Sequence, residues 1–109
     1  ASQESHFINQ LCLNVTPMVI PIYEFLYQKD ELGEQFYILV QGEMSILNKV
    51  DRRHILNNVL YDLSKLESNT ISKYNAKGAY FGEGPVLGYN HRTEYAVCTD
   101  EECKVLTAP

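Results

Sequence analysis

The chain has 109 residues, the length of one small domain with a modest hydrophobic core. Apolar residues make up 45% of it and the formal net charge is −5, which argues against direct nucleic-acid binding because that needs a basic face. No apolar run approaches the roughly 18 residues of a membrane span, and the first residues lack the basic start of a signal peptide. We expect one cytoplasmic domain over residues 1–109, without direct membrane contact, either separate or in the cytosolic part of a membrane protein. The missing initiator Met suggests a fragment of a larger protein.

The first elements in the chain are a helix and then strands. Residues 4–14 are expected to form an amphipathic helix, because the apolar residues Phe7, Ile8, Leu11, Cys12 and Val15 recur at helical spacing. Pro17 and Pro21 end any helix and lead into an extended segment at 18–28. Residues 35–40 and 43–49 are predicted as the next two strands, with a turn at Gln41-Gly42.

Residues 51–69 depart from this pattern of strands. Their apolar residues fall at intervals of three and four, which predicts a short inserted helix over 54–67; they are Ile55, Leu56, Val59, Leu60, Leu63 and Leu66. Such a helix could cover one edge of a sheet or offer a surface to a neighbouring domain.

Strands resume after this insertion. Ile71 and Tyr74 indicate a strand, 75–78 a turn, and 93–98 and 103–107 the last two strands. The eight Tyr and four Phe also favour strands over a helical bundle. The predicted fold class is mainly β, a sandwich or jelly roll.

The segment from Phe81 to Thr93 carries the strongest functional signal. Gly82 and Gly84 follow a strand end and let the backbone approach a ligand closely, exposing amide groups to an anion. Pro85 suits the first turn of a short helix. Arg92 can bind two phosphate oxygens at once, and the Glu83 carboxylate can accept a hydrogen bond from a sugar hydroxyl. A surface ion pair of Arg92 is the alternative reading, and His91 could add a further donor or simply face solvent.

The upstream residues favour the phosphate-binding reading. Residues 23–43 form a strand, an acidic turn, a second strand and a glycine corner, with Gly33 and Gly42 at its turns and Gly78 before the 81–93 segment. Over residues 18–106, apart from the insertion, the chain resembles the cyclic nucleotide-binding domain family, whose phosphate-binding cassette begins Phe-Gly-Glu. The resemblance implies a β jelly-roll (double-stranded β-helix) barrel with an N-terminal helix and a short cassette helix.

The resemblance also implies a role for each cassette residue. Phe81 opens the cassette, and Gly82 and Gly84 bring the backbone close to the ligand. Pro85 stands at the ligand where similar proteins bind the phosphate through a backbone N–H. Glu83 binds the ribose 2′-hydroxyl, and Arg92 binds the exocyclic oxygens of the cyclic phosphate. Thr93 after the Arg implies tolerance of cGMP, although it also suits an ordinary strand. The implied function is regulatory and not enzymatic, with cGMP or cAMP as ligand, no cofactor, and an attached kinase, channel or transporter as effector.

Two other functions stay open. Proline at position 85 lacks the N–H that similar proteins offer to phosphate, and Glu94 replaces a small residue, so a non-binding domain of the same fold could act as an interaction or assembly module. A metal-dependent cupin enzyme on a similar jelly roll is the second. It is disfavoured because His6, His54 and His91 are scattered and Cys12, Cys98 and Cys103 show no metal-ligand spacing.

Overall fold

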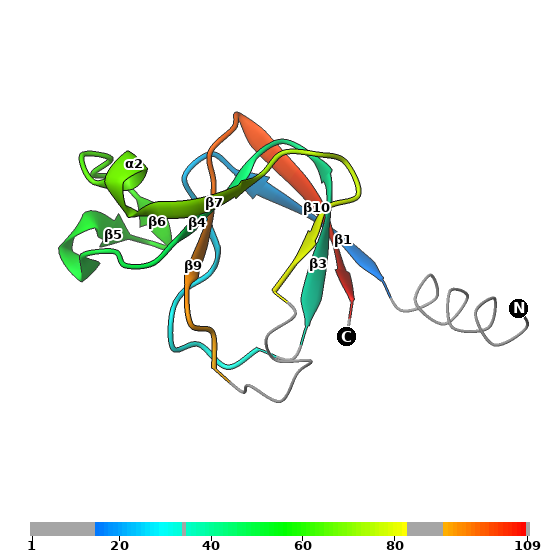
Figure 1. Ribbon diagram of the computed structural model, residues 1–109, viewed down its shortest axis with the longest axis horizontal. Helices are drawn as coiled ribbons and strands as arrows, with labels where there is room; N and C mark the ends of the chain where they lie inside the picture. The colour runs from blue at the N-terminus through cyan, green and yellow to red at the C-terminus, as the bar shows by residue number, and fades with distance from the viewer. Residues whose placement is uncertain (1–14, 34, 83–90, 109) are drawn as a thin grey trace, which may run out of the picture.

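The structure, a computed structural model, describes residues 15–33, 35–82 and 91–108. Figure 1 shows two main sheets facing each other. The expected N-terminal helix at 4–14 and the expected cassette helix after Gly84 lie outside the described residues.

Each main sheet has four antiparallel strands. The first has the order β1 (Thr16–Pro21), β10 (Glu102–Ala108), β3 (Phe36–Gln41) and β8 (Tyr80–Phe81). The second has the order β2 (Phe25–Tyr27), β9 (Tyr95–Cys98), β4 (Met44–Leu47) and β7 (Thr70–Tyr74). Chain neighbours such as β1 and β2 lie in different sheets, and the arrangement is the predicted jelly roll.

The core lies between the two sheets. Side chains alternate inward and outward along β3 and β10, so Tyr37, Leu39, Cys103 and Val105 are buried while Lys104 is exposed. All four residues of β4 are buried, and this strand pairs with β9 on one side and β7 on the other. The strand predictions at 35–40, 43–49, 93–98 and 103–107 are therefore confirmed to within a few residues.

The predicted extended segment 18–28 is correct but interrupted. Tyr23 adopts a left-handed conformation with φ 63°, and its N–H donates to the carbonyl of Cys98 at 2.7 Å. This bend carries the chain from β1 in one sheet to β2 in the other. The sequence pattern predicted one extended segment, and the structure divides it into two strands in different sheets.

The predicted helix over 54–67 is wrong for most of its length. A short 3-10 helix at Arg52–His54 precedes a hairpin of β5 (Ile55–Leu56) and β6 (Val59–Leu60), and α2 is confined to Leu66–Asn69. The turn residues Asn57 and Asn58 have φ values of 50° and 63°, a left-handed pair suited to a two-residue hairpin.

Tertiary contacts explain why the hairpin forms. The N–H of Leu60 donates to the carbonyl of Tyr23 at 2.8 Å, and the N–H of Phe25 donates to the carbonyl of Asn58 at 3.0 Å. Leu60 is buried at 3% exposure, whereas Leu56 is 64% exposed. The apolar residues therefore do not share one buried face, so their helical spacing was misleading.

Candidate functional site

Arg92 lies at the centre of the candidate site. Its side chain is buried, with 4% exposure, and its guanidinium carbon lies 4.4 Å from the ring centroid of Tyr27 and 5.5 Å from that of Tyr37. These rings belong to β2 and β3, one strand from each main sheet. The guanidinium thus lies between the two sheets, and it does not point into solvent.

Backbone hydrogen bonds fix the position of Arg92. Its N–H donates to the carbonyl of Glu31 at 2.8 Å, and its own carbonyl accepts from the N–H of Asp30 at 2.8 Å. The turn between β2 and β3 therefore holds the residue from one side. Residues 30 and 31 belong to the acidic turn that the sequence predicted.

The guanidinium itself is held by backbone carbonyls. Nη1 donates to the carbonyl of Gly82 at 2.8 Å and Nη2 donates to the carbonyl of Gln35 at 2.7 Å. Within residues 15–33, 35–82 and 91–108, no carboxylate forms an ion pair with Arg92. A buried cation stabilised by neutral dipoles and aromatic faces can still attract an anion strongly.

Two glycines make room for the guanidinium. A Cβ atom at Gly33 would lie 2.3 Å from Arg92 Nε, a distance that no real contact allows. A Cβ atom at Gly82 would lie 2.9 Å from Nη1, and Gly82 also has a positive φ of 80°. Gly82 thus allows close packing of Arg92, and its predicted approach to a ligand stays a prediction.

The neighbouring tyrosines remain neutral. Burial raises the pKa of Tyr27 far above its ordinary value, although the Arg92 charge partly offsets this. Burial also raises the pKa of Tyr37, again against the effect of Arg92. The two rings beside the guanidinium therefore add no negative charge to it, although the Glu31 carboxylate also lines this region.

A cavity opens beside this cation. Its volume is about 620 Å³, within the range of about 300–1,000 Å³ for small-molecule sites. Arg92, Tyr27, Tyr37, Gly33 and Gln35 line it, together with Glu31, His91 and the apolar Leu26 and Leu32. Such a cavity can accept a small anion that also carries polar and apolar groups.

The other predicted site residues are placed in different ways. Phe81 is 1% exposed and stacks on Tyr74 at 5.1 Å and on Tyr37 at 5.8 Å between ring centroids, so its ring belongs to the core and does not line the cavity. Thr93 is exposed and lies outside the cavity lining. His91 is exposed but lies at the cavity wall, beside Leu32 in an isolated bridge. Glu83, Gly84 and Pro85 lie outside the described residues.

Sequence reasoning missed the aromatic support of Arg92. Tyr27 and Tyr37 were counted only as strand-forming residues, and the carbonyl of Gln35 carries no side-chain signal. A tyrosine at an inward position of each of two predicted strands could have indicated a buried cation partner, because aromatic faces attract guanidinium groups.

Other classes of site find no support in the described part of the chain. No cluster of His, Cys, Asp and Glu suited to a metal ion occurs there, and Cys98 and Cys103 are buried free thiols. Cys12 lies outside the described residues. Among the described residues, no helix is both long enough and apolar enough to span a membrane.

Comparisons with known proteins identify the fold. Neither a protein-family model nor a curated protein matches the sequence. The structure is similar to the Catabolite Activator Protein of Thermus thermophilus, with a TM-score of 0.67 and 16% identity over 93% of this chain and 40% of that one. It is similar to the regulatory domain of Toxoplasma gondii PKA, solved with cAMP, with a TM-score of 0.68 and 19% identity over 91% of this chain and 33% of that one.

A third similar structure is that of an enzyme. The EAL enzyme Bd1971 matches with a TM-score of 0.64 and 14% identity over 86% of this chain and 70% of that one. This chain therefore spans less than half of the first two chains and more than two thirds of the third. Because one fold can carry several functions, these similarities establish architecture. The chain shares the jelly-roll fold of these solved structures.

Proposed function

We propose that this domain binds a cyclic nucleotide, cGMP or cAMP, in the cavity beside Arg92. The observation that carries the proposal is a 4% exposed guanidinium that lines a cavity of ligand size and has no carboxylate partner in the described residues. The cyclic phosphate carries a single negative charge, and a guanidinium can bind two of its oxygens. The similar PKA regulatory domain forms a co-crystal with cAMP, which supports the same ligand class.

The present hydrogen bonds of Arg92 suggest how binding could act on the protein. A phosphate that takes Nη1 would compete with the carbonyl of Gly82, which leads into the 81–93 cassette. A phosphate that takes Nη2 would compete with the carbonyl of Gln35 before β3. We propose that the ligand shifts the cassette by this exchange, and that the shift regulates an attached kinase, channel or transporter. The driving free energy is the difference in ligand affinity between the two arrangements.

The second candidate function is a non-binding interaction or assembly module. One observation favours it: both terminal nitrogens of Arg92 already donate to carbonyls, so the guanidinium is satisfied without a ligand. Under this alternative Arg92 is a structural residue that joins the two sheets.

Equilibrium dialysis with labelled cAMP and cGMP separates the two candidates. Regulatory binding predicts saturable, equimolar retention of one or both nucleotides, with poor competition by uncyclised AMP or GMP. No retention of either cyclic nucleotide at millimolar concentration would favour the assembly module.

A further inference from the structure

A second cavity lies at the insertion between β4 and β7. Its volume is about 640 Å³, and it shares no lining residue with the cavity beside Arg92. Its apolar part consists of Leu47 and Leu60, which are 1% and 3% exposed, and the half-buried Val50 and Leu66. Figure 1 shows β5, β6 and α2 gathered beyond the ends of β4 and β7, on the side away from β1. This cavity is therefore a separate feature of the molecule.

The acidic residues around this cavity already have polar partners. Asp51 pairs with Arg53 at 2.7 Å, Asp62 with His54 at 3.3 Å, and Glu67 with Lys73 at 3.4 Å. Asp51 also accepts from the N–H of Arg53 at 2.9 Å, and Asp62 accepts from the N–H of Ser64 at 3.0 Å. The Arg53 guanidinium thus offsets the charge of Asp51, and the Asp62 carboxylate has His54 and the N–H of Ser64 as its polar partners.

The lysines at the same cavity have no such partners. Lys49 and Lys65 line it, and no carboxylate in the described ranges pairs with either one. Residues 48–74 contain five Lys or Arg against three Asp or Glu, in a chain whose formal net charge is −5. The insertion is thus a locally basic region of an acidic protein, and its two unpaired lysines lie beside apolar surface.

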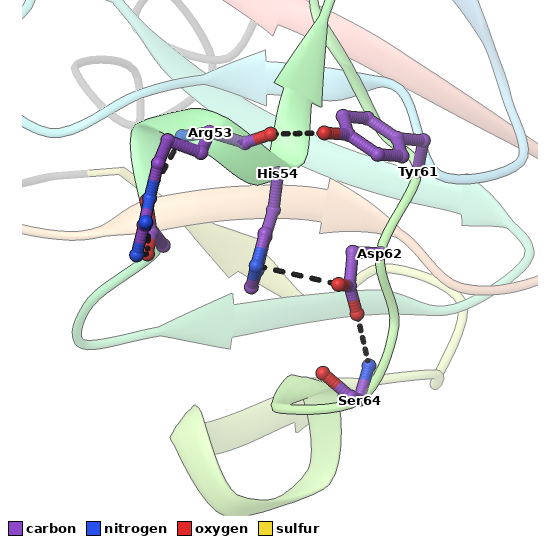
Figure 2. Close-up of polar contacts among 6 residues, drawn as sticks. Arg53, His54, Tyr61, Asp62 and Ser64 are labelled. Atoms are coloured by element: carbon purple, nitrogen blue, oxygen red, sulfur yellow. Dashed lines mark hydrogen bonds and ion pairs between the residues drawn. The ribbon is translucent and has the colours of Figure 1, made fainter.

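The wall of the cavity is built by hydrogen bonds within the insertion. Figure 2 shows the hydroxyl of Tyr61 directed at the carbonyl of Arg53, and His54 directed at Asp62. The N–H of Tyr61 also donates to the carbonyl of His54 at 3.0 Å. These contacts join the 3-10 helix to the segment after β6, so the cavity has a defined wall before any ligand arrives.

We propose that this cavity binds a small amphipathic organic anion. Its apolar body would pack on Leu47, Leu60 and Leu66, and its acidic group would lie between the ammonium groups of Lys49 and Lys65. The volume fits a ligand of drug-like size. The lining joins four apolar side chains to polar and charged ones, so it can hold the apolar body of a ligand and orient its charged end.

A matched pair of fluorescent probes tests this site. Dansylglycine carries a carboxylate, whereas dansylamide has the same fluorophore and no charge. We expect saturable, equimolar binding of dansylglycine that is tighter than that of dansylamide. Lys49→Gln and Lys65→Gln should each weaken dansylglycine binding about two- to fivefold, the range for exposed ion pairs, and leave dansylamide binding unchanged.

Control variants and mapping locate the bound probe. Lys77→Gln changes an exposed lysine in the turn after β7 and should leave both affinities unchanged. Amide chemical shifts on titration should move at residues 47–51 and 60–66. Any one of three results would overturn the proposal. The two probes could bind with equal affinity, or the folded double variant Lys49→Gln, Lys65→Gln could bind dansylglycine as the wild type does. The third such result is a set of chemical-shift changes confined to the Arg92 cavity.

Discussion

The ring of Tyr27 lies against the guanidinium of Arg92, with 4.4 Å between the guanidinium carbon and the ring centroid. Tyr27 belongs to β2 and is 7% exposed, so this contact is desolvated. A buried cation–π contact contributes about 2 kcal/mol, more than most exposed ion pairs. The pair thus replaces part of the hydration that the guanidinium loses on burial.

Replacement of Tyr27 should separate the effect of its ring from that of its hydroxyl. Tyr27→Leu should lower the free energy of unfolding by about 2–4 kcal/mol, since it removes the aromatic face and leaves a small cavity. Tyr27→Phe keeps the face and should cost less than about 1 kcal/mol. Urea denaturation measures both, and equal losses for the two variants would exclude the cation–π contact as the cause.

Gly33→Ala should displace the guanidinium, because the new Cβ would lie 2.3 Å from Arg92 Nε. We expect a loss of about 1–3 kcal/mol in stability and weaker binding of any ligand held by Arg92. Gly78→Ala is the matched control: its Cβ meets nothing within 4 Å, but its φ of 90° is strained for alanine.

The two glycine variants should therefore differ in ligand binding. Gly78→Ala should lower the free energy of unfolding by about 1 kcal/mol and leave nucleotide affinity unchanged. Isothermal titration calorimetry of both variants checks this difference. Wild-type affinity in Gly33→Ala would show that the exact place of the guanidinium is unimportant for binding.

Stability should fall in alkaline solution because of Tyr27 and Tyr37. Burial raises the pKa of both residues in the folded state above the ordinary value of 10.0. The contribution of the two buried tyrosines to the free energy of unfolding is fully present below about pH 10. It is lost as the pH rises further, because the unfolded chain then releases phenolic protons that the folded chain retains.

Urea denaturation at pH 8 and at about pH 10.5 measures this loss, and Tyr27→Phe or Tyr37→Phe should reduce it. Tyr80→Phe is the control, because Tyr80 is 64% exposed. An equal decline in the wild type and in both buried-tyrosine variants would contradict the assignment.

Asn58 should stabilise the insertion hairpin through its side chain. Nδ2 of Asn58 donates to the carbonyl of Phe25 at 2.9 Å, and its Oδ1 accepts from Gln28 Nε2 at 2.9 Å. Asn58→Gly tolerates the left-handed backbone but loses both bonds, so it should cost about 1–2 kcal/mol in stability.

Asn57→Gly is the matched variant for the same turn. Asn57 has φ 50° and no side-chain hydrogen bond to the described residues, so this change should alter stability by less than about 0.5 kcal/mol. Thermal or urea unfolding compares the two variants. Similar losses would mean that the turn backbone, and not the Asn58 side chain, secures the insertion.

The strands and the glycine-rich turn before Arg92 could be predicted because their signals are local. Alternation along β3 and β10 and the glycine-rich turn before Arg92 depend on neighbouring residues. The insertion was predicted wrongly because its conformation is decided by distant partners: Asn58 and Leu60 bond to Phe25 and Tyr23, more than 30 residues earlier. Likewise, the carbonyl of Gln35 and the ring of Tyr27 are far from Arg92 in the sequence and contact it only in the folded chain. No sequence pattern predicts which backbone carbonyl will accept a hydrogen bond or which side chains will pack together.

The affinity of cAMP and cGMP for Arg92 variants, measured by calorimetric titration, tests the central claim most directly. Arg92→Leu should weaken binding by at least about 100-fold, and Arg92→Lys, which keeps the charge but loses the planar pair of donors, should be intermediate. Arg52→Leu, at an exposed position in the insertion, should bind as the wild type does. Wild-type affinity in a folded Arg92→Leu variant would contradict the account.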